Sequence, residues 1–176
     1  MRGSPWGWGA RWPALAVAGV LAAACAGPVA REGERWHARG DGASVADLSA
    51  FDPGWQRVDG AGALLAYRHA AGARAAWLHQ CRGASAEAAP EARALLVRVA
   101  GAEVEREGPV TLAGREGWAV VARALEGDRP VTVKTVTRVS ASACTDDFVL
   151  VAERDFAALE AGFDRWWASF AEGASG

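Results

Sequence analysis

The stretch Cys144-Thr145-Asp146-Asp147-Phe148-Val149-Leu150-Val151-Ala152 decides the fold of this chain. Residues 148–152 are apolar at every position, so a strand there would have to bury both of its faces. Residues 131–139 instead alternate between apolar and polar positions, which is typical of a strand with one solvated face. Residues 144–152 are therefore predicted to form a central strand in a sheet that is covered on both sides.

A helix is predicted directly after this strand, over residues 156–170. Large apolar side chains recur there at helical spacing, while charged side chains fall elsewhere on the helical wheel. The apolar positions are Phe156, Leu159, Phe163, Trp166, Trp167 and Phe170. An aromatic stripe could serve a cofactor or a partner, but it is more often the face that a helix buries against its own sheet.

The other predicted elements are short apolar runs separated by turn residues. Strands are predicted at residues 55–58, 63–69, 73–81, 104–112, 115–125 and 130–140, and a helix at residues 86–100. The fold class is therefore α+β, with a mostly antiparallel sheet of about six to seven strands. The mid-chain helix and the C-terminal helix are expected to pack on this sheet in a single domain, residues 51–172.

Residues 1–24 have the features of an export signal. They include Arg2 and Arg11 but no acidic residue, and residues 14–24 form an apolar run of eleven residues. A transmembrane helix needs about 20 apolar residues, and Pro13 would interrupt a longer helix. The segment therefore predicts a signal peptide rather than a membrane span.

The stretch Leu21-Ala22-Ala23-Ala24-Cys25 resembles the lipobox of bacterial lipoproteins, with Ala22 at the position where Leu is commonest. The resemblance implies that Cys25 becomes the first residue of the mature chain and carries the lipid anchor. The alternative is an ordinary signal-peptidase cut after Ala24 or after Ala26. Because Ala26 is not Asp, the resemblance favours the outer membrane, with the domain facing the periplasm.

Residues 25–50 are predicted to be the lipidated Cys25 followed by a flexible tether. Residues 26–50 are rich in Gly, Ala and charged residues and show no sustained apolar period. Without the signal, 17 basic residues face 21 acidic ones, a balance of −4. This balance gives no reason to expect nucleic acid as a partner, since nucleic-acid binding calls for a basic patch.

Cys81 and Cys144 are predicted to form a disulfide, because two cysteines remain in an oxidising compartment once Cys25 is lipidated. A metal site is the alternative. His79 and Cys81 share one face of their strand, as do Cys144 and Asp146, so pairing of the two strands would bring all four together. Their spacing matches none of the usual zinc motifs, and the prediction therefore includes no metal and no cofactor.

Four features together resemble a group of small bacterial lipoproteins of unassigned function. They are residues 77–81 (WLHQC), Leu95-Leu96, residues 111–118 (TLAGREGW), and residues 144–148 (CTDDF) leading to Phe170. Those lipoproteins look related to the PsbP-like, Mog-type (DcrB-like) α/β/α sandwich. The resemblance implies an antiparallel sheet with helices on its faces and gives no catalytic residues to carry over.

Enzyme motifs such as Gly-x-Ser-x-Gly and His-Glu-x-x-His do not occur in the sequence. Asp146 and Asp147 are adjacent on a strand, so they are expected to point to opposite faces rather than act together. The predicted function is a membrane-tethered, non-catalytic accessory or binding domain of the cell envelope with a protein partner, as PsbP-like domains tend to be. The alternative is a small-ligand or metal-binding carrier that uses a pocket between sheet and helix.

Overall fold

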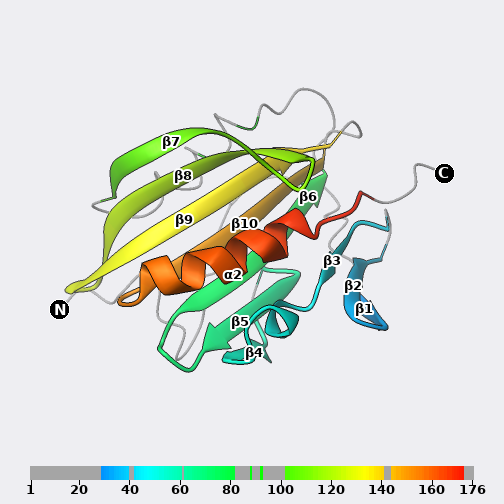
Figure 1. Cartoon of the computed structure of the whole chain (residues 1–176), viewed down its shortest axis with the longest axis horizontal. Helices are drawn as coiled ribbons and strands as arrows, with labels where there is room; N and C mark the ends of the chain where they lie inside the picture. Colours follow the sequence, from blue (N-terminus) through cyan, green and yellow to red (C-terminus); the bar gives the residue numbers. More distant parts are fainter. Residues whose placement is uncertain are drawn as a thin grey trace.

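The computed structural model describes residues 29–39, 42–60, 62–81, 88, 92, 102–140 and 144–172, and a seven-stranded sheet forms its centre (Figure 1). Each strand in this sheet is antiparallel to its neighbours. In spatial order the strands are β4 (Trp55–Val58), β5 (Leu65–His69), β6 (Arg74–Cys81), β10 (Cys144–Ala152), β9 (Arg129–Val139), β8 (Arg115–Glu126) and β7 (Glu103–Leu112). The predicted α+β class and its antiparallel sheet are confirmed.

β10 lies in the middle of the sheet, between β6 and β9, and all nine of its residues are buried. Phe148 is opposite Trp77 on β6 and Val136 on β9, and all three side chains are fully buried. A strand that is apolar on both faces is stable only where both faces are covered. The predicted central strand is therefore confirmed.

The helix α2 (Phe156–Ala168) packs across one face of the sheet, as Figure 1 shows. The ring of Trp166 meets Phe148 edge-on, with a centroid distance of 5.2 Å. The helix ends two residues earlier than predicted, but Phe170 is still buried and contacts Phe148. The large side chains of the predicted stripe that this face buries are Leu159, Phe163, Trp166 and Trp167.

The opposite face of the sheet has an aliphatic cluster of its own, which includes Val149 and Val151 of β10. Ala92 belongs to the same cluster and is fully buried. Ala88 and Ala92 are both helical, and they are the only residues of the predicted 86–100 helix that the structure describes. The remainder of that predicted helix lies outside the described residues.

The flexible tether predicted for residues 25–50 is wrong for residues 29–39 and 42–50. These residues form a second, three-stranded sheet of β1 (Val29–Glu32), β2 (Arg35–Ala38) and β3 (Ser44–Ala46), followed by the 3-10 helix η1 (Leu48–Ala50). Figure 1 shows this small sheet beside the C-terminal end of α2. The folded domain therefore includes residues 29–39 and 42–50, which lie before the predicted start at residue 51.

The small sheet is ordered because its apolar side chains join the core and its backbone pairs with the C-terminal segment. Trp36, Val45 and Leu48 are buried in the same cluster as the inner face of α2. Ser44 and Ala171 exchange two backbone hydrogen bonds of 2.8 Å. Ser44 and Ala171 lie far apart in the sequence. Contacts of this kind leave no local periodic pattern from which the small sheet could be predicted.

Candidate functional site

Cys81 and Cys144 are joined by a disulfide, which confirms the predicted pair. They lie directly opposite each other at the ends of β6 and β10. Their sequence separation of 63 residues gives a stabilisation of about 4 kcal/mol in the chain-entropy model. Cys144 is buried, with 5% of its surface exposed, while Cys81 is half-buried. The bond ties β6, the second strand of the β5–β6 hairpin, to the central strand β10.

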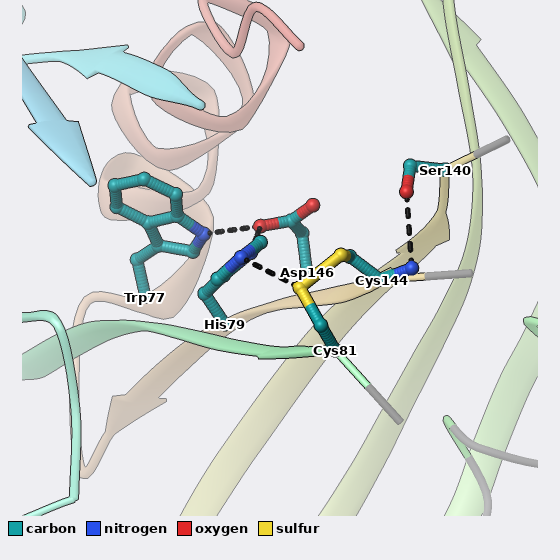
Figure 2. Close-up of a disulfide and its surroundings, with 6 residues drawn as sticks. All are labelled: Trp77, His79, Cys81, Ser140, Cys144 and Asp146. Carbon is teal, nitrogen blue, oxygen red and sulfur yellow. Dashed lines mark hydrogen bonds and ion pairs between the residues drawn. A yellow bond between two sulfur atoms is a disulfide. The ribbon is translucent and has the colours of Figure 1, made fainter. Parts of the chain in front are cut away.

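Behind the disulfide, on the same face of the sheet, lies a buried polar group of three side chains (Figure 2). Asp146 Oδ1 accepts a hydrogen bond from Trp77 Nε1 at 2.8 Å and lies 2.8 Å from His79 Nδ1. The side chains of His79 and Asp146 are 1% and 2% exposed. His79 and Asp146 are also paired in the register of β6 and β10. The sequence analysis expected pairing of these two strands to bring His79 and Asp146 together with the two cysteines, and the structure shows this arrangement.

The hydrogen bonds determine how the imidazole of His79 is oriented. An ionised carboxylate only accepts hydrogen bonds, so Nδ1 of His79 carries the proton that faces Asp146. Nε2 of His79 lies on the side of Cys81, whose Sγ is 3.3 Å away. The result is a chain of contacts from a carboxylate through an imidazole to a sulfur atom.

Arg138 on β9 extends this polar group, and the sequence analysis did not single it out. It is opposite Asp146 in the strand register, and its guanidinium lies over the Phe170 ring at 4.7 Å. Burial lowers the pKa of Arg138, while the charges of Glu172 and Asp146 act in the opposite direction.

Asp147 points to the opposite face of the sheet, as predicted. Its Oδ1 accepts a 2.6 Å hydrogen bond from the hydroxyl of Thr137, whereas Asp146 faces Trp77. The two adjacent carboxylates therefore have different surroundings and do not form a pair. Of the two carboxylates, Asp146 is the one that meets the imidazole of His79.

A second polar cluster joins α2 to β9. Lys134 Nζ donates to Glu160 at 2.8 Å and to Asp164 at 2.7 Å. Burial by itself would raise the pKa of Glu160, but the hydrogen bond and charge of Lys134 and the charge of Arg106 lower it overall. These contacts attach the helix to the sheet, and no feature of the sequence predicted them.

Cys25, the predicted lipidation site, and the predicted signal peptide of residues 1–24 lie outside the described residues. In the part of the chain that the structure describes, no helix has both the length and the apolar character needed to cross a membrane. The candidate site therefore consists of the disulfide and the polar group around His79.

The fold and this site define a class, namely an α+β domain with a seven-stranded antiparallel sheet and a cross-strand disulfide. The structure is similar to cyanobacterial PsbP (CyanoP) from Synechocystis sp. PCC 6803, with 17% identity and a TM-score of 0.53 over 78% of this chain and 91% of that one. It is also similar to LpqN, involved in cell envelope biogenesis of Mycobacterium tuberculosis, with 14% identity and a TM-score of 0.52 over 68% of this chain and 79% of that one.

At these identities the similarity shows the fold and nothing further. The PsbP-like architecture implied by the sequence resemblance is thus confirmed. No protein-family model and no curated protein sequence matches the chain.

Proposed function

We propose that this chain is an exported lipoprotein, anchored at Cys25, whose folded domain is a non-catalytic binding module of the cell envelope. The observation that carries the proposal is a basic, apolar and then small-residue leader that ends at Cys25, just before the first strand. The Cys81–Cys144 disulfide supports export, because such bonds persist in oxidising compartments. The fold shared with LpqN, a protein of envelope biogenesis, is consistent with this location.

The short distance between the proposed anchor and the domain gives the proposal a specific geometry. β1 begins at Val29, and four residue steps from Cys25 span at most about 14 Å. A lipid at Cys25 would therefore hold the β1–β3 sheet close to the bilayer. Two acyl chains give stable anchoring, whereas a single chain binds only marginally. Because Ala26 follows Cys25, we propose the outer membrane, with the domain facing the periplasm.

The pairing of the buried charges supports a non-catalytic role. Arg74 and Glu126 form a bidentate ion pair on one face of the sheet, with both side chains at most 10% exposed. On the other face, Lys134 is held between Glu160 and Asp164. Buried charges that satisfy each other in this way stabilise a particular packing arrangement and are not free to bind a substrate.

The alternative function, a carrier with a pocket between sheet and helix, has less support. The interface between the sheet and α2 is filled by aromatic rings in mutual contact. Trp77 stacks on Phe148 at 6.1 Å, and Phe170 meets both rings edge-on at 5.9 Å. A ligand pocket needs a concave, unfilled surface, so this interface favours a module that binds with its outer surface.

Membrane fractionation tests the proposed anchor. The full chain is expressed in a bacterial host, and cell fractions are probed for the wild type and for Cys25→Ser. We expect the wild type in the outer-membrane fraction, and Cys25→Ser either in the periplasmic fraction or as an unprocessed precursor. A Cys25→Ser protein that is processed and remains in the membrane fraction would contradict the proposal.

The proposed partner is another envelope protein, and cross-linking in intact cells tests it. Cross-linked species are purified through a tag at the C-terminus and identified by mass spectrometry. We expect cross-links to a defined envelope protein in the wild type and fewer in Cys25→Ser, because anchoring raises the local concentration. Cross-links unchanged by Cys25→Ser would contradict a role for the anchor, and the absence of any cross-linked envelope protein would contradict the binding function.

A further inference from the structure

We propose that reduction of the Cys81–Cys144 disulfide turns this end of the sheet into a binding site for a thiophilic divalent cation of the zinc class. The protein ligands would be the two cysteine thiolates and Nε2 of His79. This inference does not depend on the lipid anchor, since it rests only on β6 and β10. In this proposal Cys81 and Cys144 either form the disulfide or bind the metal as thiolates, and the two states exclude each other.

The distances between the three proposed ligand atoms are the first argument for a metal site. Single donor atoms of His79, Cys81 and Cys144 all lie within 4.8 Å of one another. In a tetrahedral zinc site with Zn–S of about 2.3 Å and Zn–N of about 2.0–2.1 Å, a sulfur and a nitrogen ligand are about 3.6 Å apart. Cys81 Sγ and His79 Nε2 are already 3.3 Å apart. The two sulfur atoms must separate once the bond is broken, and the paired strands hold Cys81 and Cys144 in register.

The hydrogen bonds of His79 are the second argument for a metal site. A disulfide does not require a neighbouring imidazole that is held in one orientation. Metal-binding histidines commonly donate their second ring N–H to a carboxylate, which fixes the tautomer and makes the free nitrogen a better ligand. Asp146 accepts from Nδ1 of His79 in this manner, and Trp77 Nε1 in turn orients the carboxylate (Figure 2). Nε2, the ring nitrogen on the side away from Asp146, therefore faces the Cys81 sulfur and can act as a ligand there in its unprotonated form.

The change between the two states is an ordinary thiol–disulfide exchange. A dithiol reductant attacks the half-buried Cys81 sulfur and expels the Cys144 thiolate, and its second thiol then releases Cys81. The reductant becomes a disulfide, and the protein gains two electrons and two protons. Binding of the cation displaces the protons of the two thiols. Three protein ligands leave the fourth tetrahedral position to water or an exchangeable ligand.

Cobalt(II) titration tests the site, because thiolate coordination gives intense near-ultraviolet charge-transfer bands and tetrahedral geometry gives visible bands. The full chain carries Cys25→Ser, so that Cys81 and Cys144 are its only cysteines. It is reduced with a phosphine, desalted without oxygen and compared with the oxidised protein. We expect one equivalent of Co²⁺ with thiolate bands in the reduced protein, displaced by Zn²⁺, and no such bands in the oxidised protein. Reduced protein without these bands would overturn the proposal.

Variants separate a built site from simple chelation by two thiols. Asp146→Asn should weaken Co²⁺ binding by about 10- to 100-fold, and His79→Gln should weaken it at least as much. His37→Gln, on the small sheet, is the matched control and should bind like the parent protein. Equal affinity of the His79→Gln and parent proteins would overturn the assignment of His79.

X-ray absorption of the zinc-loaded, reduced parent protein gives a result that does not depend on how the variants fold. We expect two sulfur neighbours and at least one imidazole nitrogen around the metal. A zinc environment without an imidazole would overturn the proposal. A reduced protein that unfolds and is not refolded by Zn²⁺ would overturn it as well.

Discussion

The imidazole of His69 occupies the space in which a side chain at position 54 would lie. A Cβ atom on Gly54 would be 2.2 Å from Nε2 of His69. That imidazole accepts a hydrogen bond from the backbone of Ala71 at Nδ1 and pairs with Asp52 through Nε2 at 3.1 Å. Gly54 thus permits a close contact between the turn before β4 and the end of β5.

Gly54→Ala should therefore destabilise the domain by about 1–3 kcal/mol, the usual cost of forcing extra atoms into a packed site. Urea unfolding followed by tryptophan fluorescence measures the change. Gly108→Ala is the matched control, because a Cβ atom there meets nothing within 4 Å. Equal unfolding free energies for the two variants would show that His69 does not need the space at position 54.

The small N-terminal sheet should contribute to stability rather than act as a spacer. Deleting residues 26–50 removes Trp36, Val45 and Leu48 from the core and the carbonyl of Ala46 that accepts from Trp166. Since burying each large apolar side chain contributes about 1.5–3 kcal/mol, we expect a loss of more than about 3 kcal/mol. Urea unfolding measures it.

The control for this deletion is a flexible Gly-Ser insertion before Val29, which lengthens the chain ahead of β1 and leaves the small sheet intact. We expect no change in unfolding free energy for the insertion. A deletion variant as stable as the parent protein would mean that residues 29–50 do act as a tether.

The disulfide predicts a particular thiol count. Unfolded but unreduced protein carrying Cys25→Ser should contain no free thiol, and reduction should lower the unfolding free energy by about 4 kcal/mol. Thiol titration in denaturant and urea unfolding with and without reductant measure the two quantities. Two free thiols before reduction would refute the bond.

The contact between α2 and β9 should be sensitive to acid. The pKa of Glu160 is lower in the folded domain than its ordinary value of 4.5, so its ion pair with Lys134 stabilises the fold above that pH. This contribution is lost as the pH falls through the lower, folded-state pKa. Glu160→Gln should cost about 1 kcal/mol at pH 7, and the difference from the parent protein should shrink below pH 4.5.

Urea unfolding at a series of pH values between 3 and 7, run on both proteins, measures this difference. Glu172→Gln is a suitable control, since that carboxylate is nearly half exposed and its contact with Arg138 is a long one of 3.4 Å. A constant difference between Glu160→Gln and the parent protein across the pH range would contradict the ion pair.

The elements predicted correctly from the sequence are those with a strong local pattern. β10 and α2 each bury side chains along most of their length. Their sequences therefore show a sustained apolar run and a repeated aromatic spacing, from which a strand and a helix can be predicted. The strands β1, β2 and β3 are only three or four residues long, which is too short for a reliable alternation. These strands are also held in place by partners that are distant in the sequence, such as Ala171, which is more than 120 residues away from Ser44.

The candidate site was predicted only in part, for a related reason. Parity of the cysteines identified the disulfide, and strand alternation placed His79 and Asp146 on the matching faces of two strands. The positions of Trp77 and Arg138 beside Asp146 depend on the sheet order and on side-chain rotamers. Neither of these can be read from a single sequence.

The mass of the N-terminal peptide of the exported protein tests the central claim most directly. The full chain is expressed in a bacterium, purified from membranes in detergent, digested and analysed by mass spectrometry. The proposed anchor predicts that the mature chain begins at Cys25 and that this residue carries a diacylglycerol thioether. A mature chain that begins after Ala26, or a Cys25 with an unmodified thiol, would contradict the account.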